Sequence, residues 1–191
     1  MTSQIFREYP ASALAPIHAS LRRIAGAVSW TVAFGVLLAI GGSIYSVMMP
    51  RTISSFIGLG DACTPQNIAM NGVRLRLFFA FLPGLVLFGV IAVQVRALFR
   101  RFSLGVILDQ GNARRLSTIG WLIIAGGAIS MLERTLLALA LTFGNPEGQR
   151  QLLISLSTTD VIIVLFGLFV LAFAHVIGEG ARIADENRGF V

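Results

Sequence analysis

The sequence has few charged residues and no lysine. Aspartate, glutamate and arginine make up 13% of its 191 residues, which is about half the share of a usual soluble domain. This scarcity excludes an ordinary soluble domain. All of the basic residues are arginines, and they flank apolar segments. The net charge of +6 therefore indicates an orientation in a membrane and not direct contact with nucleic acid.

Cysteine, histidine and the common catalytic motifs are scarce as well. Cys63 is the single cysteine, which excludes an intrachain disulfide, and His18 and His175 lie far apart in sequence. The sequence contains no glycine-rich phosphate loop, no G-x-S-x-G elbow and no H-E-x-x-H motif. We therefore expect no metal site, no cofactor and no enzymatic activity.

The sequence does contain long apolar segments. Hydrophobic residues make up 55% of the chain, and they gather in four blocks, each long enough for the roughly 20 residues of a bilayer-spanning helix. The predicted spans are residues 24–49, 77–98, 116–143 and 152–176. This pattern predicts an all-α integral membrane protein, an antiparallel up-and-down bundle of four transmembrane helices.

The length of the first span and the prolines in and after the later spans give further predictions. The first apolar run is too long for the core of a signal peptide, so we interpret it as an uncleaved anchor. Pro83-Gly84 predicts a kink in the second span, and Pro146 follows the predicted end of the third. The chain then divides into an N-terminal segment (1–23), a four-helix membrane domain (24–176) and a C-terminal tail (177–191).

The arginines of the short loops predict the side on which each end lies, because cytoplasmic loops are enriched in basic residues. With the N-terminus inside, the cytoplasmic side holds Arg7, Arg22, Arg23, Arg96, Arg100, Arg101, Arg114, Arg115, Arg182 and Arg188. The outer side holds only Arg51, Arg74, Arg76 and Arg150. We therefore predict that both termini are cytoplasmic.

Glu133 and Arg134 lie inside the third apolar span, where an unpaired charge is costly. Adjacent helical residues point about 100° apart, so these two cannot simply pair with each other. Arg134 lies nine residues before the predicted outer end of its span, and Asp160 lies eight residues after the predicted outer start of the next. These depths predict an Arg134–Asp160 ion pair, with Glu133 facing another helix or a polar cavity.

This intramembrane polar site allows three interpretations. Glu133, Arg134 and Asp160 can form a proton or ligand site, or they can form a structural clasp that fixes helix register. The third span can also end early, near Leu132, which would leave the charges at the membrane interface. Glycines such as Gly41 and those at 126–127 favour close helix packing, either within the bundle or in a homo-oligomer.

Two stretches resemble a known family. One comprises Phe102, Gly105-Val106-Ile107, Asn112-Ala113, Leu116 and Ile119-Gly120-Trp121, and the other runs from Glu179 to Asn187 and closes on Val191. Together they resemble the bacterial membrane family named domain of unknown function 2975, over nearly the whole chain in span order. Leu108 and the stretch Arg188-Gly189-Phe190 depart from what many relatives show.

The resemblance implies a four-helix protein of the bacterial inner membrane without an established activity. It also implies a partner, because many members look to be encoded beside a small helix-turn-helix DNA-binding protein. In the predicted topology both stretches face the cytoplasm, where they would dock that partner. The predicted docking residues are Arg100, Arg101, Arg114, Arg115, Glu179, Arg182, Asp185, Glu186 and Asn187. The simpler alternative for the tail is a solvated helix end.

We therefore hypothesise a non-enzymatic membrane protein that acts in regulation through a cytoplasmic partner. The main alternative is a small ion-coupled transporter or channel that uses Glu133, Arg134 and Asp160. A third hypothesis is an accessory subunit of a larger membrane complex.

Overall fold

The computed structural model describes residues 11–57, 71–107, 109–146, 148, 150 and 152–188. Arg7, Cys63, Leu108 and residues 189–191 lie outside the described residues. The described helices are α1 (Ala11–Met48), α2 (Pro50–Phe56), α4 (Asn71–Ser103), α5 (Gln110–Thr142) and α6 (Thr158–Arg188). All but α2 are long and apolar enough to cross a membrane, which confirms the prediction of four such helices.

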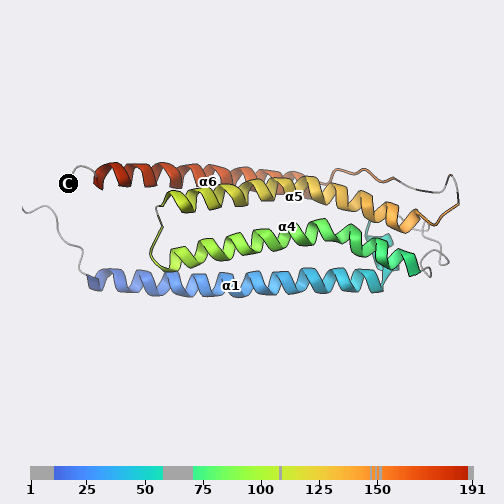
Figure 1. Cartoon of the computed structure of the whole chain (residues 1–191), viewed down its shortest axis with the longest axis horizontal. Coiled ribbons are helices and arrows are strands. Elements are labelled where there is room, and N and C mark those ends of the chain that lie inside the picture. The colour runs from blue at the N-terminus through green and yellow to red at the C-terminus, as the bar shows by residue number, and fades with distance from the viewer. Residues whose placement is uncertain are drawn as a thin grey trace, which may run out of the picture.

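The four long helices lie in a row in the order α1, α4, α5, α6, each antiparallel to its neighbour (Figure 1). The main packing is between α1 and α4, α4 and α5, and α5 and α6, whereas α1 and α6 lie at the two edges with almost no direct contact. The up-and-down order matches the sequence prediction, but the bundle is open because the last helix does not close onto the first.

The start of α1 and the end of α6 lie at the same end of this row, which we call the termini end (Figure 1). At the opposite end, the short helix α2 packs its buried Ile53 against α4 and α5. The core there includes Leu77 of α4 and Leu137 and Leu141 of α5. This apolar core fixes the positions of α4 and α5 beside the polar residues of the third span.

Glycines bring α5 and α6 close together. A side chain carbon added to Gly167 would lie 3.0 Å from the carbonyl oxygen of Gly120, and one added to Gly127 would lie 3.0 Å from Val164 Cγ2. Such spacing leaves no room for larger residues, as in other close membrane helix pairs. By contrast, Gly41 of α1 has no atom of the described residues within 4 Å of its added carbon.

Two features of the helices answer questions that the sequence left open. α5 continues unbroken from Gln110 to Thr142, so the third helix is continuous through Glu133 and Arg134 and does not end near Leu132. α4 continues through Pro83, and its axis changes direction along its length (Figure 1). This bend agrees with the predicted kink, because proline removes a backbone hydrogen bond and crowds the preceding turn.

α6 begins at Thr158, six residues later than the predicted start of the fourth span at Leu152. Residues 152–157 are not helical. The backbone N–H of Ser157 donates to Asp160 Oδ2 at 2.8 Å, and that of Thr159 donates to Ser157 Oγ at 3.3 Å. This reciprocal arrangement is a capping box, and it starts the helix at this point.

Candidate functional site

Asp160 is the centre of the polar cluster between α5 and α6. It lies in the first turn of α6 and is buried, with 3% of its surface exposed. Its Oδ1 accepts a hydrogen bond from Ser130 Oγ at 2.5 Å, and its Oδ2 accepts from Arg134 and from the backbone of Ser157. The ion pair between Arg134 and Asp160 that the sequence predicts is therefore present.

Arg134 and its neighbour Thr135 also hold the non-helical segment 152–157. Arg134 Nη2 donates to the carbonyl oxygen of Ser155 at 3.2 Å, and Thr135 Oγ1 donates to that of Leu153 at 2.9 Å. Within a membrane, non-helical backbone must find partners inside the protein. These two side chains supply them, which explains how an extended segment can lie beside α5.

Glu133 stands apart from this cluster. It is half-buried, it points at α4, and a side chain carbon added to Gly84 would lie 2.5 Å from its Oε2. The Glu133 carboxylate forms no hydrogen bond and no ion pair with the residues that the structure describes. The structure thus joins two of the three predicted residues and places the third against another helix, as the sequence analysis expects.

A cavity of about 450 Å³ lies beside Glu133 and Arg134. It opens between the end of α1, α2, α4 and α5. Its lining residues are Ser46, Thr52, Ile53, Ile57, Phe81, Ser130, Glu133, Arg134 and Leu137. The cavity is therefore mainly apolar, with three hydroxyl groups, the Glu133 carboxylate and the Arg134 guanidinium in its wall. The sequence analysis did not predict the roles of Ser130, Ser46 and Thr52.

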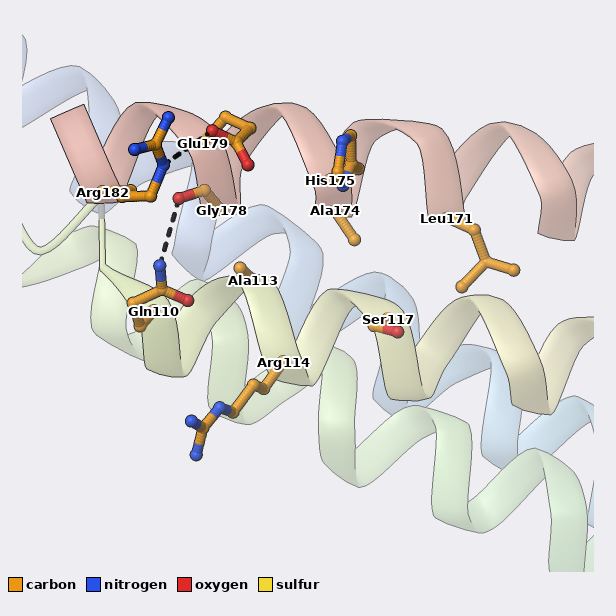
Figure 2. A pocket seen from close by; sticks show the side chains of 10 residues that line it. All are labelled: Gln110, Ala113, Arg114, Ser117, Leu171, Ala174, His175, Gly178, Glu179 and Arg182. Carbon is orange, nitrogen blue, oxygen red and sulfur yellow. Dashed lines mark hydrogen bonds and ion pairs between the residues drawn. The ribbon is translucent and has the colours of Figure 1, made fainter.

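A second hollow, of about 400 Å³, lies between the start of α5 and the last turns of α6 (Figure 2). Its lining residues are Gln110, Ala113, Arg114, Ser117, Leu171, Ala174, His175, Gly178, Glu179 and Arg182. We call this hollow the termini groove. Gln110 Nε2 donates to the carbonyl oxygen of Gly178 across it at 3.2 Å. In Figure 2 the Arg114 side chain extends away from α6 at its edge.

The predicted docking residues divide between this groove and its surroundings. Arg114, Glu179 and Arg182 line the groove. Arg182 forms ion pairs with Glu179 at 2.9 Å and with Glu186 at 2.6 Å, both on its own helix. The remaining predicted residues, Arg100, Arg101, Arg115, Asp185, Glu186 and Asn187, lie outside its lining.

The connection between α4 and α5 is fixed by Gly105 and Asn112. Gly105 has a φ of +80°, and the bonds Gly105 N–H to Phe102 O and Val106 N–H to Arg101 O form a Schellman motif that ends α4. The fully buried Asn112 donates to the carbonyl oxygens of Val106 and, at 3.2 Å, Ile107. The first family-like stretch is thus a structured turn.

Arg101 and Asp109 complete this turn with an ion pair of 3.2 Å. A side chain carbon added to Gly111 would lie 2.9 Å from Asp109 Oδ2 and closer still to Arg101, so a larger residue here would require these two side chains to shift. Arg115 Nη1 donates to Gln94 Oε1 at 3.2 Å and ties α5 to α4. Arg101 and Arg115 are therefore engaged within the protein.

Comparison with protein families matches residues 58–188 to the family described as "Protein of unknown function (DUF2975)". The match covers well over half of the chain. The chain belongs to this family. The DUF2975 match contains the polar cluster between α5 and α6 and both family-like stretches up to Arg188, and it leaves out α1 and α2. Searches of curated proteins and of solved structures found no significant match.

Proposed function

We propose that this DUF2975 protein is a non-enzymatic, multi-pass protein of the bacterial inner membrane that binds a cytoplasmic helix-turn-helix regulator. The termini end would face the cytoplasm, and the termini groove would be the docking site. The four apolar helices of membrane-spanning length support the membrane location. The partner rests on the family resemblance and on the geometry of the groove.

The observation that carries this proposal is that the two family-like stretches meet in space. The start of α5 belongs to the first stretch, and the end of α6 belongs to the second (Figure 2). Gln110 bonds to the backbone of Gly178, and a side chain carbon on Gly178 would touch the Ala113 methyl group at 3.5 Å. Gly178 directly precedes the second stretch, and residues of both stretches, such as Ala113 and Glu179, line the groove, so two stretches far apart in sequence form one surface.

The charges of this end favour an acidic partner surface. Arg100 and Arg114 form no ion pair with any described residue, whereas Arg182 is neutralised by Glu179 and Glu186. Unpaired exposed arginines attract acidic groups and can bind carboxylates through two hydrogen bonds. A regulator would therefore present acidic residues here and keep its basic DNA-binding face free.

The test is crosslinked affinity purification of the full chain from native membranes, followed by mass spectrometry. We expect a helix-turn-helix protein to be recovered with the wild type and to be lost with Arg114→Glu. It should also be lost when Asp185, Glu186 and Asn187 are all changed to alanine. Arg74→Glu, at the opposite end of the row, is the matched charge-reversal control and should recover the protein normally. Identical recovery from all variants would refute the proposal.

A small ion-coupled transporter or channel is the second candidate. The specific observation in its favour is that α6 starts beside buried charges after the non-helical segment 152–157, an arrangement that transporters use at substrate sites. Glu133, Arg134 and Asp160 would form its pathway. Flux across proteoliposomes that is lost in Glu133→Gln, with the fold intact, would support transport. No flux under any applied ion gradient would exclude it.

A further inference from the structure

The cavity beside Glu133 combines an apolar wall with a carboxylate that forms no ion pair with the described residues. Ile53, Ile57 and Leu137 supply aliphatic surface, and Phe81 adds an aromatic face. Apolar walls with a few placed polar groups are typical of sites for small organic molecules. At about 450 Å³ the cavity falls within the size range of such sites.

The charge that the cavity presents to a ligand depends on which partners Arg134 and Glu133 already bind. Arg134 is the nearest cation in sequence, but its guanidinium binds Asp160 and the carbonyl oxygen of Ser155. Glu133 has no such partner among the described residues. In an apolar surrounding, a nearby cation strongly stabilises the charged form of a carboxylate.

The lining excludes two other classes of ligand. The described residues contain no group of three or more histidine, cysteine, aspartate or glutamate side chains that would hold a metal ion. The Arg134 guanidinium in the same wall is already bound to Asp160, which leaves the Glu133 carboxylate to meet a ligand, and a carboxylate repels an anion. A cation with an apolar body satisfies both parts of the cavity, because its charge meets the carboxylate and its body replaces water on the apolar wall.

We propose that this cavity binds a monovalent organic cation with an apolar body, with Glu133 as its counter-ion. Phe81 would contact the cation through its ring face. Ser46 and Thr52, from α1 and α2, would accept or donate hydrogen bonds at the rim. The site lies beside the core of the opposite end and shares no residue with the termini groove. Its test is therefore independent of the regulator.

The probe is tetraphenylphosphonium, and the measurement is equilibrium binding to the purified full-length protein in nanodiscs. We expect saturable binding to the wild type and an affinity at least about tenfold lower in Glu133→Gln, because one partner of a desolvated charge pair is lost. Glu133→Asp keeps the charge and should recover much of the affinity. Tetraphenylborate, an anion of the same shape, should show no binding that depends on Glu133.

Glycine variants of α4 provide a matched pair. Gly84→Ala should weaken binding severalfold, because the added methyl group would lie 2.5 Å from Glu133 Oε2 and must displace the carboxylate. Gly89→Ala, on the same helix with no described atom within 4 Å, should bind as the wild type does. Equal affinity in wild type, Glu133→Gln and Gly84→Ala would overturn the proposal. Absence of saturable binding to a folded wild type would overturn it as well.

Discussion

Asp160 links three parts of the chain through one carboxylate. It accepts hydrogen bonds from Ser130 and Arg134 of α5, and from the backbone of Ser157 just before α6. A buried carboxylate requires such partners, because an unpaired charge in an apolar medium is very unfavourable. The side chain therefore sets the register of α6 against α5 and also begins α6.

Replacing Asp160 by asparagine should destabilise the protein substantially. Removing one partner of a buried ion pair typically costs about 3–5 kcal/mol. Arg134 keeps 24% of its side chain exposed, so we expect a loss at or below the lower end of that range. Thermal unfolding of the purified protein in detergent should show a clearly lower Tm.

The control for this variant is Glu186→Gln, which removes an exposed ion pair with Arg182. Exposed pairs on one helix contribute only about 0.2–0.5 kcal/mol, so its Tm should hardly change. If both variants unfold at the same temperature as the wild type, Asp160 does not hold α5 and α6 together.

Much of this cluster could be predicted from residue depth, and some of it could not. The depth of Arg134 and Asp160 predicts their pairing because the two flanking helices are antiparallel neighbours. Ser130 lies four residues before Arg134 and so shares its helix face, a spacing that signals its role but that the sequence analysis did not use. The orientation of Glu133 over Gly84 depends on packing between α4 and α5, which no local pattern contains.

At the scale of the helix, the start of α6 shows that hydropathy alone does not locate where a helix begins. Residues 152–154 are apolar, so counting apolar residues extends the fourth span back to Leu152. The sequence from Ser157 to Asp160 carries the signature of a capping box, which marks the true start at Thr158. The non-helical segment before it is held by side chains of α5, and that contact is not readable from local sequence.

The end of α4 gives a prediction with opposite outcomes at two glycines. Gly105→Ala should destabilise the protein by about 1 kcal/mol, because Gly105 has a φ of +80°, where a side chain is unfavourable. Gly89 lies within the helix, and a side chain carbon added to it would have no described atom within 4 Å. Gly89→Ala should therefore leave stability unchanged or raise it by up to about 1 kcal/mol. Equal changes in Tm for the two variants would contradict the assignment of the Schellman motif.

The close approach of α5 and α6 gives a further prediction. Gly167→Ala should destabilise the protein by about 1–3 kcal/mol, because the added methyl group would meet Ile124 at 2.6 Å and the backbone of Gly120 at 3.0 Å. Gly41→Ala on α1 meets no described atom and is the matched control. Thermal unfolding should separate the two. A Gly167→Ala protein as stable as the control would show that the helices can separate at little cost.

At the scale of the whole molecule, the open row leaves both edge helices with one long neighbour each. α1 packs mainly on α4 and exposes large side chains such as Trp30, Leu37 and Leu38. In a membrane, such a face meets lipid or another apolar helix. The four spans and their order were predictable because each exceeds the thickness of a bilayer. The open arrangement was not, because it depends on which faces pack.

The orientation of the row can be tested with the single cysteine. Arginine counts predict that the segment between α2 and α4, which carries Cys63, lies on the outer side of the membrane. A membrane-impermeant maleimide should therefore label Cys63 in intact cells. A Cys63→Ser/Ser103→Cys variant, with its thiol at the end of α4, should be labelled only after permeabilisation. The reverse pattern would place both termini outside.

Docking of a cytoplasmic regulator in the termini groove can be tested by photo-crosslinking. The most direct measurement places a photo-crosslinking amino acid at Ser117 or His175 in the groove, and at Val86 on α4 as a control. The proposal predicts that light attaches a helix-turn-helix protein to the two groove positions and not to Val86. Crosslinks only to lipid or to this chain, from all three positions, would contradict it.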